Sequence, residues 1–143
     1  MILLDTNVIS ELWKVKPNPN VLAWMDAQVI ETLYLSAITV AELRYGLALM
    51  PEGKRRTIYQ ERLANEVLPA FAGRVLPFDL DASQAYADLM ARAKEGGKAI
   101  SKADGCIAAT AVAHRLIVAT RDTGPFEAAG LKTINPWEVS QMR

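Results

Sequence analysis

The order of elements along this chain of 143 residues predicts an α/β fold: a central parallel sheet of about five strands with helices on both faces. Two observations support this prediction. Short apolar runs alternate with longer helix-like segments, and Gly or Pro residues separate the two kinds of segment. No internal repeat, low-complexity tract or linker is visible, so we expect one domain that spans residues 1–143.

The first half of the chain is expected to contain two strands and four helices. The strands are residues 2–4 and 33–36, and the helices are residues 6–12, 21–27, 38–50 and 57–71. Pro51 and Gly53 end the third of these helices, since neither residue continues a helix well. The Lys16-Pro17-Asn18-Pro19-Asn20 stretch is expected to be a loop.

The second half continues the alternation of strands and helices. Strands are expected at 74–78, 116–120 and 131–134, and helices at 81–95, 101–115 and 126–129. Gly96 and Gly97 end the first of these helices. Ser101 is in the N-cap position of the next one, and Asp104 is at the third helical position, which is the spacing of a capping box.

Composition excludes several classes of protein. Lys plus Arg equals Asp plus Glu at 16 each, and this zero net charge argues against a protein that coats DNA. The single cysteine, Cys106, excludes an intramolecular disulfide, and no Cys/His cluster could hold zinc. The first residues lack the basic segment of a signal peptide, and no apolar run is long enough to cross a membrane. We therefore expect a cytoplasmic protein without membrane contact.

Four carboxylates have no basic residue three or four positions away: Asp5, Glu42, Asp104 and Asp122. Asp26 and Glu31 share this property, so it is a weak signal by itself. Glu42 and Asp104, however, lie in largely apolar helical segments, where a buried carboxylate needs a partner or a proton. Asp5 follows the first strand and Asp122 lies just past a later one, which is where parallel sheets bind ligands.

If the four acids converge, they require positive charge. Neighbouring carboxylates about 5 Å apart repel by roughly 3 kcal/mol at an effective dielectric constant near 20. Two Mg²⁺ ions would balance four negative charges with the oxygen ligands that these ions prefer. Taken singly, Asp5 could be a helix N-cap, Asp104 could complete the cap with Ser101, and Asp122 could be a turn residue. Glu42 has no comparable structural explanation.

Four segments around these acids resemble the four acidic motifs of the PIN domain. They are LDTNV at 4–8, TVAEL at 39–43, ADGCIAAT at 103–110 and ATRD at 119–122. The resemblance covers essentially the whole chain, including TINPW at 133–137, and is strongest to VapC-type toxins of bacterial toxin–antitoxin pairs, in their FitB-like branch. Many relatives have Asn at the position of Asp122 and an acid three residues later, where this chain has Pro125.

The resemblance implies a strand order of 3-2-1-4-5, with the first and fourth strands adjacent. It implies an endoribonuclease that uses Mg²⁺ or Mn²⁺ to activate water for in-line attack on an RNA phosphodiester. Asp5, Glu42, Asp104 and Asp122 would be the catalytic and metal-binding acids. Thr6, Asn7 and Thr120 would orient the carboxylates or metal-bound water, and Arg121 is a candidate for contact with the substrate.

The same resemblance implies the partners of the chain. They are an RNA substrate, a cognate antitoxin protein and a second copy of the chain in a homodimer, with DNA contacted only indirectly through the antitoxin. The run Lys54-Arg55-Arg56 with Arg62 could bind RNA phosphates, although the intervening Glu52 and Glu61 favour a solvated start of a helix.

Two other functions remain possible from the residues alone. A haloacid-dehalogenase-type phosphatase would need a second Asp two residues after the first, where this chain has Asn7. A non-catalytic binding module could use the acidic pocket to receive a basic peptide. Metal-dependent RNA cleavage, compared with an Asp5→Asn control, separates these possibilities from a nuclease.

Overall fold

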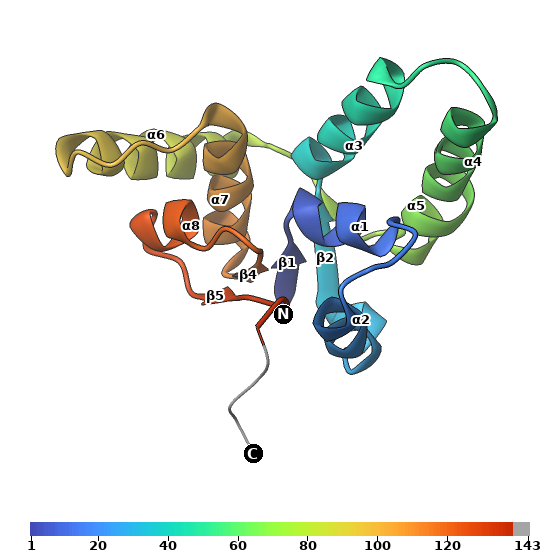
Figure 1. Ribbon diagram of the computed structural model, residues 1–143. Helices are drawn as coiled ribbons and strands as arrows, with labels where there is room; N and C mark the ends of the chain where they lie inside the picture. Colours follow the sequence, from blue (N-terminus) through green and yellow to red (C-terminus); the bar gives the residue numbers. More distant parts are fainter. Residues whose placement is uncertain (139–143) are drawn as a thin grey trace.

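The computed structural model describes residues 1–138. Its sheet is parallel and has five strands in the order β3-β2-β1-β4-β5, which confirms the predicted order (Figure 1). The strands are β1 (Ile2–Leu4), β2 (Leu33–Ser36), β3 (Val75–Leu76), β4 (Ile117–Ala119) and β5 (Thr133–Ile134). β2 and β3 add to one side of β1, and β4 and β5 add to its other side. The carboxyl ends of β1 and β4 therefore lie side by side at the point where the strand order reverses.

Alternate side chains of each strand pack on opposite faces of the sheet, so both faces are apolar. Leu4 packs with Leu35 and Ala119 in one core cluster. Leu3 packs with Val118 in the other. All five are fully buried, as expected for strands of a parallel sheet that is covered on both sides.

Helices cover both faces, as the sequence predicts. They are α1 (Thr6–Leu12), α2 (Pro19–Asp26), α3 (Ala37–Leu49), α4 (Lys54–Arg62), α5 (Leu68–Ala70), α6 (Leu80–Glu95), α7 (Lys102–His114) and α8 (Gly124–Ala128). The first core cluster includes buried side chains of α1, α2 and α3. The second includes those of α6, α7 and α8, which lie on the other side of the sheet (Figure 1).

Side-chain caps fix where the helices that carry the candidate acids begin. Ser36 Oγ accepts a hydrogen bond from Thr39 N at 3.0 Å at the start of α3. Ser101 Oγ accepts one from Asp104 N at 3.1 Å at the start of α7, which confirms the predicted cap. Each cap contributes about 1 kcal/mol and sets the rotation of the first helical turn.

Several boundaries differ from the prediction, including the starts of β5 at Thr133 and of α8 at Gly124. Helix α2 begins at Pro19, two residues earlier than expected, because Asn18 caps it and proline is well suited to the first helical position. The helix expected at 57–71 begins instead at Lys54 and passes through a π-helical segment at Leu63–Val67 before α5. β3 is only two residues long, where 74–78 was expected.

Close packing of α7 against α6 depends on Gly105. A Cβ atom at this position would lie 2.7 Å from Met90 Sδ and 3.1 Å from a ring carbon of Tyr86. Both distances are shorter than ordinary van der Waals contact, so a larger residue at this position would force the Met90 and Tyr86 side chains to move. The residue that precedes Gly105 is the candidate acid Asp104.

Among residues 1–138, none of the helices combines the length and the apolar character that crossing a bilayer requires.

Candidate functional site

The site lies at the carboxyl edge of the sheet, where β1 and β4 end. Leu4 pairs with Ala119 in the parallel register, and Asp5 N continues the ladder by donating to Ala119 O at 2.9 Å. The chain then turns directly into α1, with Asp5 as its N-cap. Asp5 therefore lies beside Thr120, the residue that follows β4.

The Asp5 carboxylate is buried and both of its oxygens are hydrogen-bonded. Asp5 is only 6% exposed. Oδ1 accepts from Thr6 N at 2.8 Å, and Oδ2 accepts from the Thr120 hydroxyl at 2.8 Å. The expected N-cap role and a candidate role in chemistry are thus both compatible with the geometry.

Burial raises the pKa of the Asp5 carboxyl from 3.8 to about 6. The hydrogen bonds from Thr120 and Thr6 oppose this rise, because they stabilise the anion. The negative charges of Asp104 and Glu42 add to it, since like charges disfavour a second anion nearby. Three of the four predicted acids therefore interact electrostatically at this edge, although they come from distant parts of the sequence.

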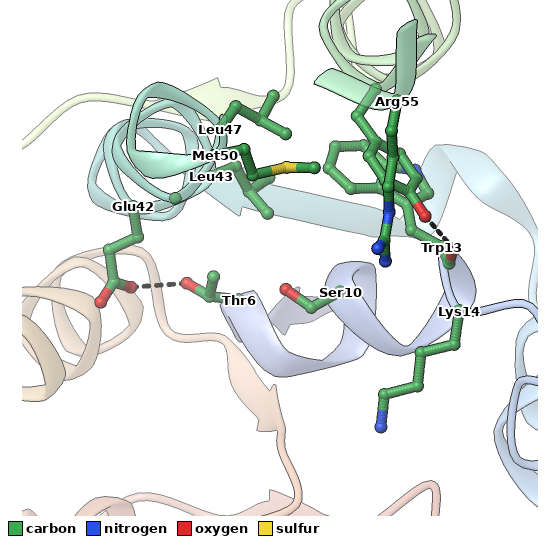
Figure 2. Close-up of a pocket in the computed structure, with 11 residues that line it drawn as sticks. Thr6, Ser10, Trp13, Lys14, Glu42, Leu43, Leu47, Met50 and Arg55 are labelled. Carbon is green, nitrogen blue, oxygen red and sulfur yellow. Dashed lines mark hydrogen bonds between the residues drawn. The ribbon is translucent and has the colours of Figure 1, made fainter. Parts of the chain in front are cut away.

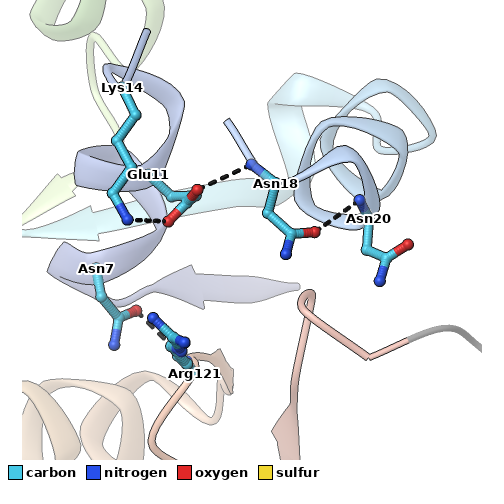
Figure 3. Close-up of polar contacts among 6 residues, drawn as sticks. All are labelled: Asn7, Glu11, Lys14, Asn18, Asn20 and Arg121. Carbon is cyan, nitrogen blue, oxygen red and sulfur yellow. Dashed lines mark hydrogen bonds and ion pairs between the residues drawn. The ribbon is translucent and has the colours of Figure 1, made fainter. Parts of the chain in front are cut away.

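Thr120 connects three of the predicted site residues. Besides donating to Asp5, its Oγ1 accepts from Asn7 Nδ2 at 3.3 Å and from Asp122 N at 3.2 Å. Asn7 Oδ1 in turn accepts from Arg121 N at 3.5 Å (Figure 3). These contacts link α1 to the segment after β4 through side chains that the sequence had marked as orienting groups.

Glu42 on α3 is held by a chain of hydroxyl groups. The Thr6 hydroxyl donates to Glu42 Oε1 at 2.6 Å (Figure 2). Thr6 Oγ1 also lies 3.1 Å from Thr39 Oγ1, which accepts from the Ser36 hydroxyl at 3.2 Å. Ser36 and Thr39 are fully buried, and neither was predicted as a site residue. The cap spacing of Ser36 and Thr39 could have identified them.

Asp104 and Asp122 are held less firmly. Asp104 is partly buried in the first turn of α7, where its backbone N–H is capped by Ser101. Asp122 is exposed and is connected to the site through its backbone N–H and Thr120. Within residues 1–138, the side chains of these two acids accept no hydrogen bond or ion pair from the protein.

The chemistry of the donor set fits a divalent cation, although the carboxylates are not arranged as a closed ligand shell. In the described part of the chain, no three His, Cys, Asp or Glu side chains converge closely enough to hold an ion as they stand. The oxygens of Asp5 and Glu42 instead contact protein hydroxyl and N–H groups. Hard oxygen ligands and the mutual repulsion at Asp5 are nevertheless what a Mg²⁺-type ion would satisfy.

Arg121 does not extend toward the acids. Its guanidinium carbon lies 5.7 Å from the centroid of the Trp137 ring, in a cation–π arrangement, and the residue is exposed. Its contact with a substrate therefore remains a prediction.

Glu11 is a buried acid that the sequence reasoning missed. It is 5% exposed and forms an ion pair with Lys14 at 2.8 Å (Figure 3). It also accepts from Asn18 N at 2.8 Å. Lys14 and Asn18 lower the pKa of the Glu11 carboxyl. The three-residue spacing of Glu11 and Lys14 was a visible signal. Its contacts connect α1 to the start of α2, a structural role.

A hollow of about 260 Å³ opens beside Glu42, between α1, α3 and α4 (Figure 2). Thr6 and Glu42 lie at one end, and Trp13 and Arg55 lie at the other, with Tyr59 stacked on Trp13. The candidate acidic edge therefore continues into a concave surface with a different chemical character.

The profile of the PIN domain matches residues 2–131 of this chain. A relative named VapC ribonuclease Y4jK, from Sinorhizobium fredii, is 78% identical over 138 residues, covering 96% of this chain and 99% of the relative. The toxin FitB of Neisseria gonorrhoeae is 56% identical over 137 residues, covering 96% of this chain and 99% of that protein.

The fold agrees with these sequence matches. A solved structure of FitAB bound to an IR36 DNA fragment superposes with a TM-score of 0.96 and 52% sequence identity, and the match covers all of both chains. Sequence and fold agree over essentially the same residues, so the chain belongs to the PIN-domain family and is similar throughout its length to relatives named VapC ribonuclease and toxin FitB.

Proposed function

We propose that this chain is a metal-dependent endoribonuclease and the toxin of a type II toxin–antitoxin system. The observation that carries the proposal is that Thr6 hydrogen-bonds to both Asp5 and Glu42 at the carboxyl edge of the sheet, through its backbone N–H and its hydroxyl respectively. The similarity to a VapC ribonuclease and to toxin FitB supports both parts of the proposal. Its domain is taken to be the whole chain, residues 1–143.

Asp5, Glu42, Asp104 and Asp122 would hold Mg²⁺ or Mn²⁺. When bound, such an ion polarises the phosphoryl group and activates water for hydrolysis of the RNA phosphodiester. The protein contributes preorganised carboxylates. Thr6 N–H and the Thr120 hydroxyl fix the two oxygens of Asp5, and the Thr6 hydroxyl fixes Glu42.

Asp122 joins the set as the acid with the weakest attachment. Its backbone N–H donates to Thr120 Oγ1, so it is tied to the same hydroxyl that orients Asp5. Its exposed carboxylate can rotate toward an ion or toward solvent. We assign it a supporting role.

The partners proposed are a cognate antitoxin protein and a second copy of the chain. The similar FitAB complex is bound to a DNA fragment, which supports a partner protein and a DNA-bound assembly, and we propose that the antitoxin carries the DNA contact. A homodimer is expected from the family resemblance. Light scattering of the purified chain, with and without a candidate antitoxin, tests both partners.

The deciding experiment compares the chain with its Asp5→Asn variant on single-stranded and structured RNA. We expect cleavage in Mg²⁺ or Mn²⁺ by the unaltered chain and none in EDTA. Asp5→Asn should reduce cleavage by about 10³-fold or more, while its circular dichroism spectrum is unchanged. Undiminished cleavage by this variant would contradict the assigned site, and failure of the unaltered chain to cleave any RNA would favour a non-catalytic acidic pocket.

A further inference from the structure

A second hollow extends the one beside Glu42. It has a volume of about 550 Å³ and lies between the end of α1 and the exposed face of α4. Trp13, Lys14, Arg55 and Tyr59 line both hollows, so the two adjoin each other along these residues. We call the two adjoining hollows together the α1–α4 groove, with Glu42 lining the first hollow and Arg62 lining the second.

The groove combines an apolar floor with a basic rim. Trp13 and Tyr59 stack with their ring centroids 5.7 Å apart. Val15, 93% exposed, and Ile58, 42% exposed, extend this apolar surface. These two side chains line one hollow together with Trp13 and Tyr59, and apolar surface bordered by charged residues is typical of an interaction site.

The basic rim comes from one face of α4. Lys54, Arg55 and Arg62 line the groove, and none of them forms an ion pair within residues 1–138. The guanidinium carbons of Arg55 and Arg62 each lie 5.7 Å from the centroid of the Tyr59 ring. Arg56, one residue along, lines neither hollow. Three positive charges are therefore held at the groove rather than spread around the helix.

The opposite charges at the two ends select the kind of ligand. A basic peptide suits Glu42 but is repelled by the rim of α4. An acidic peptide suits that rim but is repelled by Glu42 and Asp5. A single-stranded nucleic acid, in contrast, places phosphates against cations and base faces against apolar side chains. With divalent ions at the acidic edge, one RNA strand satisfies both ends.

We propose that the α1–α4 groove binds the RNA strand on one side of the cleaved phosphodiester, with Lys54, Arg55 and Arg62 contacting its phosphates. This proposal rests on the nuclease function proposed above. The Lys54-Arg55-Arg56 run is then more than a solvated start of a helix. Lys54 and Arg55 lie on the face of α4 that lines the groove, whereas Arg56 does not line it.

Arg55 and Arg56 provide a matched pair for the test. Binding of a short fluorescein-labelled single-stranded RNA is measured by anisotropy in Mg²⁺, using the Asp5→Asn chain so that the probe stays intact. Adding Arg55→Gln should raise Kd about fivefold and lower the slope of log Kd against log salt by about 0.7, as loss of one phosphate contact does for single strands. Adding Arg56→Gln should leave Kd within twofold of the Asp5→Asn value and the salt slope unchanged.

Cleavage by the otherwise unaltered chain gives the second measurement. Arg55→Gln should raise KM with little change in kcat, because the groove contributes to binding and not to the reacting atoms. Equal effects of Arg55→Gln and Arg56→Gln on Kd, or an unchanged salt slope, would overturn the groove proposal even if the chain cleaves RNA. If the Arg55 dependence of binding appears but the chain does not cleave RNA, the groove stands and the nuclease function fails.

Discussion

Two pairs of acids at the same edge of the sheet are held in different ways. Asp5 and Glu42 accept short hydrogen bonds from Thr6 and Thr120, and these bonds restrict their rotamers. Asp104 and Asp122 are positioned through their backbone N–H groups, while their carboxylates accept no such bond within residues 1–138. The first pair is oriented before any ligand arrives, and the second pair can adjust to one.

This difference indicates how the chain stays folded although the carboxylates of the candidate site repel one another. Hydrogen bonds to the most buried carboxylate offset part of the cost of its charge, while the more exposed carboxylates keep their hydration. Two firmly oriented carboxylates are enough to define the geometry of the candidate site, so the other two can adjust to a ligand. The predictions below test this contrast, beginning with the largest effect.

The largest effect concerns the stability cost of Asp5. Burial raises the pKa of its carboxyl from 3.8 to about 6, so the folded state binds more protons than the unfolded state between these pH values. Stability in EDTA should therefore fall as pH rises through this window, by up to about 3 kcal/mol from this group. Asp5→Asn removes the cost and should be more stable than the unaltered chain at pH 7.5, but not at pH 4. Urea unfolding at the two pH values measures the difference.

Magnesium supplies the control for this experiment. An ion bound near Asp5 stabilises the anion, so Mg²⁺ should raise the melting temperature of the unaltered chain more than that of Asp5→Asn. A stability difference between the two proteins that is the same at pH 4 and pH 7.5 would show that Asp5 carries no such cost.

The next effect concerns the hydroxyl that orients Asp5. Thr120→Val should lower RNA cleavage about 10- to 100-fold, the usual cost of losing a group that orients a ligand. Because this hydrogen bond lowers the pKa of Asp5, the acid limb of the cleavage profile should also move to higher pH. Thr110→Val is the matched control, since Thr110 is equally buried but donates to Cys106 O within α7. Equal losses of RNA cleavage in the two variants would show that Thr120 contributes only to packing.

The smallest effect is expected at Asp122. Its carboxylate is exposed, and its attachment to Thr120 runs through the backbone, which Asp122→Asn preserves. We expect this variant to reduce cleavage less than tenfold, and Asp5→Asn is the comparison under the same conditions. A loss as large as that of Asp5→Asn would show that the two acids are equally essential, which would contradict the contrast between firmly held and adjustable acids.

Much of the fold was predictable from local signals. β1 and β2 are short apolar runs, and each is followed by a helix whose N-cap is Asp5 or Ser36 respectively. The start of α2 was missed because Pro19 was interpreted as part of a loop, although proline is favoured in a first turn. The π-helical segment before Pro69 was also missed, since a proline without an N–H disturbs the preceding turn in a way that periodicity does not reveal.

The candidate site was predictable in its members but not in its contacts. Apolar helical surroundings identified Glu42 and Asp104, the end of the first strand identified Asp5, and the family resemblance gave their grouping. The cap spacing could have identified Ser36 and Thr39, but the contacts from Thr39 through Thr6 to Glu42 could not be predicted, because a hydroxyl carries no periodic signal of the side chain it faces. Which basic residues of α4 line a groove likewise depends on how α4 packs beside α1.

The glycine at position 105 makes the position of Asp104 dependent on α6, the helix that precedes α7. Since Met90 and Tyr86 occupy the space that a larger residue would need, the first turn of α7 packs directly on α6. Substitution of those two side chains would shift the first turn of α7, and Asp104 with it, without changing the carboxylate itself. These two positions therefore offer protein engineers a means of adjusting where this carboxylate lies from outside the candidate site.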